Sequence, residues 1–283
     1  MRTRVSFIVG CVLCVSISAG AQEISNTHFF PGVARLAGVP PSQWVSDVTV
    51  SNLNDSAVVV GFQFFPERTS HTFFDLTFPV RVSLEPLETR LFEDVLASLF
   101  GQSEDIKGGI LMTTEDELLM TTSNGEDAVV AAAMRTYDVS SPLGGTAGQT
   151  VPSNGNMVNF SGNPSYVTGA RNDSRFRSNL GLVSISLQEV TIHYRIRKSD
   201  GTVVAEGNKT LGSISMDQWS FDRLGVGSQE GPLLVELWLD PDDVSTDPEL
   251  EPPEANSFFA YVSKIDSDSQ DAEFMWAAPV YMD

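Results

Sequence analysis

The sequence predicts an all-β protein made of two tandem antiparallel β-sandwich units, and three observations support this. Apolar and polar residues alternate along short segments, turn residues separate the segments, and the same order of segments occurs twice. A sheet with one buried face requires this period of two. About seven short strands in about 110–130 residues are typical of a sandwich.

The two copies align without a gap over their first half when the chain is shifted by 132 residues, which places Trp44 on Phe176. Later the offset falls to 128, as shorter loops in the second copy would require. The aligned segments are 44–50 with 176–182, 58–64 with 190–196, Asp94 with Asp222, Leu96 with Leu224, and 134–138 with 262–266. Internal repeats take priority in reading a fold, so we interpret the chain as a duplicated domain.

The repeat sets the domain boundaries. We expect a signal segment at 1–21, a first domain at 22–153, a linker at 154–163 and a second domain at 164–283. The copies close on Pro152 and Pro279, and Ser, Asn and Gly predominate between them, as in a flexible linker.

Strands are expected wherever the alternation is clearest. In the first copy these segments are 45–51, 58–64, 73–84, 108–113 and 128–136, and in the second copy they are 179–185, 190–196, 233–239 and 257–265.

One short helix is expected in the first domain only. Apolar residues recur at helical spacing at Leu91, Phe92, Val95, Leu96 and Leu99, and Gly101 marks an end. This spacing predicts about three turns that cap one edge of the sandwich.

The N-terminus has the pattern of a secretory signal. Arg2 and Arg4 precede an apolar run, and small residues end at Ala21 before Gln22. The run is shorter than the roughly 20 residues of a membrane-spanning helix, so no span is expected after cleavage. The only two cysteines lie inside this segment, which leaves the mature chain without disulfides or thiol chemistry. We therefore expect a bacterial protein in the periplasm, on the cell surface or outside the cell.

Charge excludes one class of partner. Two of the 17 basic residues precede Gln22, so 15 basic and 37 acidic residues remain, a net charge of −22. A nucleic-acid binder needs a cationic face, so nucleic acid is not an expected partner.

The aligned blocks also carry a resemblance to known proteins. Each copy begins with an aromatic-x-Ser/Thr-Asp/Asn-Leu/Val block, which is Trp44, Ser46, Asp47 and Val48 in the first copy. The second copy has Phe176, Ser178, Asn179 and Leu180 at these positions. This arrangement resembles uncharacterised secreted bacterial proteins with tandem immunoglobulin-like β-sandwich repeats. The resemblance implies architecture and export, and it brings no activity, substrate or catalytic residue.

No catalytic motif is found. The three histidines, His28, His71 and His193, have no second histidine or carboxylate at a metal-site spacing, and no serine lies in a nucleophile elbow. We therefore expect a protein without enzymatic activity. An extracellular polymer hydrolase stays an alternative, because a catalytic triad or carboxylate pair is recognised by geometry and not by order in the chain.

One basic island is the best candidate for ligand binding. Residues 171–198 hold six basic residues against two acidic ones, a net charge of +4. If the two strands in this stretch pair, their side chains cluster, and arginine forks suit carboxylates. The candidate residues are Arg175, Arg177, His193, Arg195 and Arg197. The alternative is that they neutralise acidic residues of their own domain.

Clustered acids and the tryptophans are weaker candidates. Asp240, Asp242 and Asp243 begin an acidic, proline-rich loop that could hold calcium, although the regular spacing of a calcium loop is absent. A solvated loop is the favoured interpretation, so no cofactor is expected, and the acids of 266–271 are interpreted as a hairpin turn. Trp44 and Trp238 could stack on sugars but are expected to pack in the cores.

Together these features predict an exported, non-enzymatic binding or structural module at the bacterial cell surface or outside the cell. Its expected partner is an extracellular protein or an acidic glycan. A subunit of a surface assembly, which would expose sheet edges or a large apolar patch, is the second alternative.

Overall fold

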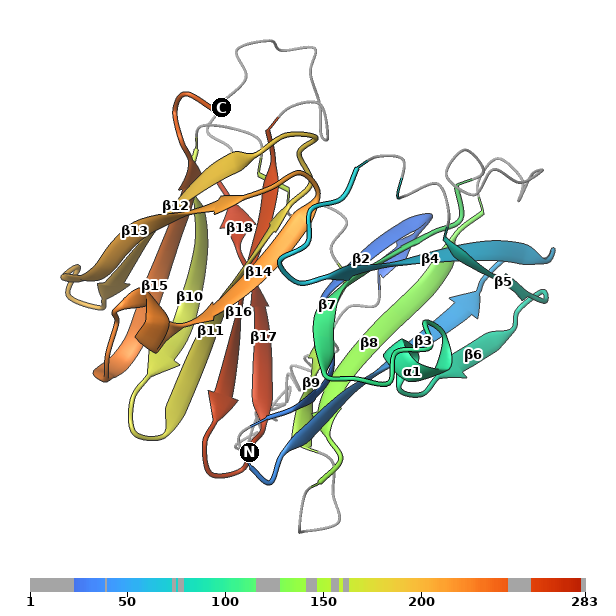
Figure 1. The fold of residues 1–283 in the computed structure, drawn as a ribbon, viewed down its shortest axis with the longest axis horizontal. Helices are drawn as coiled ribbons and strands as arrows, with labels where there is room; N and C mark the ends of the chain where they lie inside the picture. The colour runs from blue at the N-terminus through green and yellow to red at the C-terminus, as the bar shows by residue number, and fades with distance from the viewer. Residues whose placement is uncertain are drawn as a thin grey trace, which may run out of the picture.

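A computed structural model describes most of the chain. The described residues are 23–38, 40–72, 75, 79–115, 128–140, 147–153, 158–159, 163–243 and 256–280. The predicted signal segment, most of the predicted linker and the acids that follow residue 243 lie outside them. The predicted all-β class is confirmed, since the described chain consists of antiparallel strands and short helical turns (Figure 1). No helix among the described residues has the length and apolarity to cross a membrane.

The first half contains two layers of strands around one core. One layer is formed, in order, by β2 (Thr27–Ala37), β7 (Ile106–Thr113), β4 (Val58–Pro66) and β5 (Val80–Leu84). The other is formed by β1 (Glu23–Ser25), β9 (Ala147–Val151), β8 (Val130–Asp138), β3 (Gln43–Asn52) and β6 (Thr89–Phe92), with both β1 and β9 beside β8. The end of β2 pairs with β3 and links the layers. The core contains Phe30, Phe62 and Ile110 from one layer and Val48 and Met134 from the other.

The second half also has two layers. A five-stranded sheet contains β13 (Val203–Leu211), β12 (Val190–Lys198), β15 (Gln229–Leu239), β10 (Ser165–Asn172) and β18 (Ala278–Pro279). A four-stranded sheet contains β14 (Ser215–Ser220), β11 (Phe176–Ser184), β16 (Phe258–Asp266) and β17 (Ala272–Trp276). Alternate residues from both sheets, including Leu180, Ile196 and Val235, fill a separate core.

Equivalent strands of the two halves have the same register. Val48 lies opposite Met134 across β3 and β8, and Leu180 lies opposite Val262 across β11 and β16. The offsets are 132 and 128 residues, which are the two offsets found in the sequence alignment.

The same hydrogen bond connects the two layers of each half. The amide of Ala34 donates to Ser46 Oγ at 2.9 Å, and the amide of Arg171 donates to Ser178 Oγ at 3.1 Å. Ser46 and Ser178 are the serines of the aromatic-x-Ser/Thr block. The position favours serine because its hydroxyl satisfies a backbone donor that the pairing of the strands leaves free.

The predicted helix is much shorter than expected. Leu91 and Phe92 belong to β6, where they pair with β3, and only α1 (Val95–Ser98) is helical. The apolar residues had the spacing of one longer helix because the strand β6 is followed closely by the single turn α1. In the second half a 3-10 turn, η2 (Phe221–Leu224), occurs at the matched position, although no helix was predicted there.

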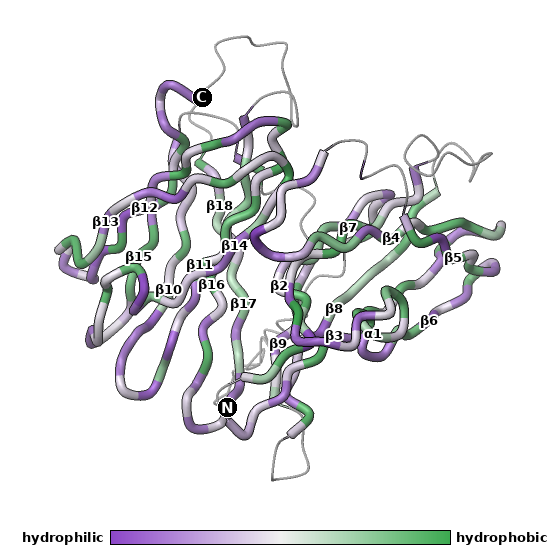
Figure 2. The backbone as a smooth tube through the Cα atoms, in the orientation of Figure 1, coloured by the Kyte–Doolittle hydropathy of each residue, from purple (hydrophilic) through white to green (hydrophobic). Residues whose placement is uncertain are grey.

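The two halves pack against each other through apolar faces. The outer face of the β2–β7–β4 layer meets the outer face of the β14–β11–β16–β17 sheet, and Figures 1 and 2 show these strands side by side, with apolar segments along them. The side chains buried between them include Phe29, Phe65, Val183, Ile214, Met216, Phe259 and Tyr261. Tyr261 is the largest and is 1% exposed. Its ring lies directly over Gly181, where any Cβ would collide with it.

A backbone contact adds to this interface. The segment 67–72, which follows β4, runs along the free edge of β14 in the other half. The amide of Arg68 donates to Met216 O at 2.8 Å, and the amide of His71 donates to Ser213 O at 3.0 Å. The Arg68 guanidinium also pairs with Asp217 at 3.0 Å. The edge of β14 is therefore covered within the molecule.

Candidate functional site

The basic island of the sequence is divided between two sheets. Arg175 and Arg177 lie just before and within β11, whereas His193, Arg195 and Arg197 lie on β12. The strand β11 pairs with β14 and β16, and β12 pairs with β13 and β15. The pairing of the two strands, on which a single cluster depended, is therefore wrong, because strands adjacent in sequence lie here in opposite layers of the half.

The three residues on β12 each have a carboxylate partner nearby. They point outward from the five-stranded sheet, where carboxylates from β13, β15 and the following turn reach them. Arg195 pairs with Glu206 and Glu236, Arg197 pairs with Glu236, and His193 Nε2 lies within hydrogen-bond distance of Asp240 Oδ2, at N···O distances of 3.1–3.5 Å. This group corresponds to the intramolecular alternative of the sequence analysis, and exposed pairs of this kind add little stability.

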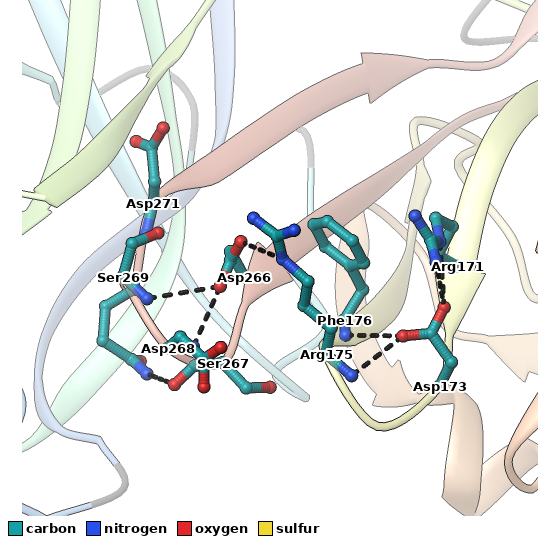
Figure 3. Close-up of polar contacts among 10 residues, drawn as sticks. Arg171, Asp173, Arg175, Phe176, Asp266, Ser267, Asp268, Ser269 and Asp271 are labelled. Atoms are coloured by element: carbon teal, nitrogen blue, oxygen red, sulfur yellow. Dashed lines mark hydrogen bonds and ion pairs between the residues drawn. The ribbon is translucent and has the colours of Figure 1, made fainter.

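Arg175 joins two hairpin turns. Its Nε donates to Asp266 Oδ2 at 2.9 Å, and its carbonyl accepts from the amide of Ser267 at 2.7 Å (Figure 3). The other oxygen of Asp266 accepts from the amides of Asp268 and Ser269. These bonds hold the Asp266 pKa below its usual value. The acids of 266–271 thus form a hairpin turn, as predicted.

Arg177 is different because it has no carboxylate partner within the described chain. Its Nη2 donates to Gln270 Oε1 at 2.8 Å, so its partner among the described residues is a neutral amide. The side chain is half-buried, and this burial lowers the pKa of the guanidinium. A desolvated and uncompensated cation is costly in a folded protein, so its presence calls for an explanation.

Arg177 lines a cleft between the two halves. The cleft has a volume of about 360 Å³. Its polar lining residues are Glu67, Lys107, Thr136 and Gln149 from the first half and Arg177, Asn179, Gln218, Ser220, Arg223 and Ser263 from the second. Trp44 adds an aromatic wall. Concave sites with a few converging polar groups are the usual places for ligands.

The cleft carries an excess of positive charge. Glu67 Oε1 accepts from Lys107 Nζ at 2.7 Å and from the amide of Gln218 at 3.0 Å, and burial raises the pKa of the Glu67 carboxyl. These contacts neutralise Lys107. Arg177 and the exposed Arg223 have no ion pair among the described residues, so the lining presents two uncompensated guanidinium groups.

The two tryptophans expected in the cores lie elsewhere. Trp44 lines the cleft, and Trp238 lies on the outer face of the five-stranded sheet against His193 and Arg195. The core prediction is therefore wrong for both. The apolar residues around Trp238 in the sequence suggested burial, but its side chain points outward between the inward-facing Leu237 and Leu239.

The predicted calcium ligands serve as turn residues. Asp240 accepts from the amide of Asp242 at 3.0 Å and pairs with His193, and Asp243 accepts from the amide of Thr191 at 2.9 Å. In the part of the chain that the structure describes, no three metal-ligating side chains converge on one point.

Most of the cleft could not be identified from the sequence. Glu67, Lys107, Gln218 and Arg223 are far apart in sequence and meet only because the halves pack together. Two lining residues had been singled out, Arg177 through its place in the basic island and Trp44 as a weaker sugar-stacking candidate that was expected in the core.

Comparison with known proteins does not identify a family. No protein-family model and no curated protein matches the chain. Among solved structures, a β-glucuronidase from Bacteroides uniformis is 11% identical, with a TM-score of 0.17, over 92% of this chain and 32% of that one. Bacteroides uniformis β-glucuronidase 2 covalently bound to cyclophellitol-6-carboxylate aziridine is 10% identical, with a TM-score of 0.15, over 92% and 33%. The chain spans about a third of the length of these structures, and TM-scores this low carry no information about function.

Proposed function

We propose that the protein is an exported, non-enzymatic binding module that holds an anionic ligand in the cleft between its halves. The observation that carries the proposal is Arg177, a half-buried guanidinium in the cleft wall whose partner is a neutral amide. A carboxylate or sulfate would supply the missing counter-charge through a bidentate contact. The other four basic candidates have carboxylate partners of their own.

We further propose that the scaffold consists of two tandem immunoglobulin-like β-sandwiches that arose by duplication. The equal registers and the matched bonds at Ser46 and Ser178 support this. A second matched pair is found at the hairpins. The amide of Val139 donates to the carbonyl of Gln43, as the amide of Ser267 does to Arg175.

The lining favours binding over hydrolysis. Glu67 is the one carboxylate among the described residues that line the cleft, and no histidine or cysteine lines it there. Hydrolysis of a glycosidic bond ordinarily uses two carboxylates on either side of the bond. Glu67 is also engaged by Lys107 and by a backbone amide.

Titration calorimetry with two kinds of polyanion tests the proposal. The probes are uronate hexasaccharides and hexaglutamate, at 20 and 150 mM NaCl. We expect binding of at least one probe, weakened by salt, and a loss of about 10- to 100-fold in Arg177→Gln, since a charge-assisted hydrogen bond contributes about 1.5–3 kcal/mol. Arg90→Gln is the matched control, because Arg90 is a partly exposed strand arginine paired with Glu88 far from the cleft. Absence of binding by both probes, or equal losses in the two variants, would refute the proposal.

A further inference from the structure

Trp44 differs from the other three tryptophans, because no described residue stacks on its ring, places a cation over it or accepts a hydrogen bond from its N–H. Trp219 lies under Lys209, Trp238 is stacked with His193, and Trp276 packs against Phe274 and donates to Pro152 O at 3.2 Å. All four tryptophans lie in the part of the chain that the structure describes. The exception is the one that lines the cleft.

The repeat explains why this ring is open. The counterpart of Trp44 is Phe176, whose ring is surrounded by three cations. These are Arg171 at 4.3 Å, Arg175 at 5.2 Å and Lys264 at 5.8 Å from the ring centroid. At the matching positions the first half has Ala34, Gln43 and Thr136, and none of these carries a charge. Ala34 and Thr136 themselves line the cleft.

The indole of Trp44 is fixed in position. Trp44 pairs with Leu36 and Asp138 on its two sides, at the point where β2 joins β3. Gly38 lies against the indole so closely that a Cβ at this position would meet Nε1 and Cδ1. The ring is therefore a preformed surface, which lowers the entropic cost of binding.

The chemistry around this ring suits a sugar. An aromatic face is electron-rich and attracts the weakly positive C–H groups on one side of a pyranose ring. Amides and hydroxyls, which both donate and accept, match sugar hydroxyls, and the lining offers Gln149, Asn179, Gln218 and Ser220.

We propose that the ligand of the cleft is a carboxylated saccharide, with a sugar ring on the Trp44 indole and a carboxylate on Arg177. This inference rests on the proposed function and narrows its ligand from any anion to an acidic carbohydrate. An acidic polypeptide would use Arg177 without needing the open ring.

The experiment compares sugars with a peptide of similar charge. Calorimetry is carried out on the full chain with hexamers of galacturonate, mannuronate and glucuronate, with their methyl esters, and with hexaglutamate. We expect one or more uronates to bind at least 10-fold more tightly than their methyl esters and hexaglutamate. Trp44→Ala should weaken this binding at least 10-fold, and Trp44→Phe should weaken it less, since a smaller aromatic face remains.

Fluorescence provides a second readout and a control for folding. Bound uronate should change the tryptophan emission of the parent protein and of Trp238→Phe but not that of Trp44→Phe. Thermal unfolding of each variant checks that it is folded, and Trp44→Phe keeps an aromatic ring in place if Trp44→Ala does not fold.

The outcomes separate this inference from the proposed function. If hexaglutamate binds as tightly as the uronates, or Trp44 variants bind uronate normally, the carbohydrate inference is overturned while the anion-binding function stands. If no uronate and no hexaglutamate binds, both are overturned.

Discussion

The outer face of the β2–β7–β4 layer in the first half carries Phe29, Phe65 and Leu111, whereas the equivalent face of the second half carries Tyr166, Arg197 and Glu236. The registers make the positions equivalent, because Phe29 lies opposite Leu111 as Tyr166 lies opposite Glu236. The first face is buried between the halves, whereas the second faces solvent and is partly exposed. The two halves thus share a strand arrangement, but this outer face is apolar and buried in the first half and polar and charged in the second.

The other layer of each half, which contains β11 and β16 or the equivalent β3 and β8, shows the reverse pattern, since its outer face is apolar in the second half only. In the second half Gly181 lies opposite Tyr261 and Val183 opposite Phe259, and both pairs belong to the interface. The first half has Thr49 opposite Ala133 and Ser51 opposite Ala131 at these positions. Among the described residues a complementary pair of faces therefore occurs once, and the two outward faces do not match each other. The described outward faces therefore offer no second copy of this contact, which argues against a surface assembly built by repeating it.

The largest expected effect comes from removing the centre of the interface. Tyr261→Ala should lower the free energy of unfolding by about 3–5 kcal/mol, because a fully buried aromatic side chain leaves a cavity. Tyr166→Ala, on the equivalent exposed side of the second half, should cost about 1 kcal/mol or less. Urea denaturation measures both, and similar losses would contradict the difference between the two faces.

A smaller difference in stability is expected at the contact between the end of a strand and the short helical turn, which both halves contain. Asn172 is 6% exposed and donates to Asp222 at 2.9 Å and to Gly227 O at 2.7 Å, whereas the first half has a partly exposed Arg35–Asp94 ion pair. Asn172→Ala should cost about 1–3 kcal/mol, because it leaves buried groups unsatisfied. Arg35→Ala should cost about 1 kcal/mol or less. The reverse order in chemical denaturation would contradict the larger contribution of the buried Asn172 bonds.

The hairpin turn that holds Arg177 provides a third test. Gln270 has a left-handed backbone with φ of 59°, which disfavours residues other than glycine. Gln270→Gly should change stability by less than about 1 kcal/mol, since relief of this strain offsets the lost side-chain bonds. Polyanion affinity should fall several-fold, because Arg177 loses its positioning partner. Unchanged affinity in calorimetry would mean that Gln270 serves the turn alone.

The smallest expected effect is a pH dependence at the joint between the halves. Burial lowers the pKa of His71, and Asp75 opposes this shift only in part. Because the folded state favours the neutral imidazole, this contribution to stability is complete above the unfolded pKa of about 6.5 and is lost as pH falls toward the lowered value. The parent should therefore lose more stability than His71→Phe between pH 7.5 and 5.5. Parallel denaturation curves at both pH values would exclude this role for His71.

Strand pattern and repeat offset could be predicted from the sequence because they depend on local alternation. The strands β4 and β12 follow the predicted periods closely. The strand β2 was missed because Pro31 and Gly32 interrupt its pattern, and at Gly32 the register shifts with a φ of 74°. Its counterpart β10 was missed for the same reason, since Gly169 has a φ of 85° at an equivalent register shift.

The candidate site could be predicted only in part. Arg177 stood out by charge, but nothing local distinguishes it from Arg175, which has a carboxylate partner. The difference depends on which hairpin residue lies beside each guanidinium in space. Likewise, Trp44 and Trp276 differ in their neighbours across the interface, and these neighbours come from distant parts of the chain.

The covered edge of β14 has a further consequence for how a ligand could be taken up. Moving the halves apart would strip the segment 67–72 from that edge and at the same time bring Tyr261 and Phe259 into water. Two unfavourable exposures would then accompany any hinge opening. We therefore expect the walls of the cleft to keep their spacing when a ligand binds, so that liganded and free forms superimpose. On the proposed function, selection among ligands would then come from their shape and charge and not from a closing motion.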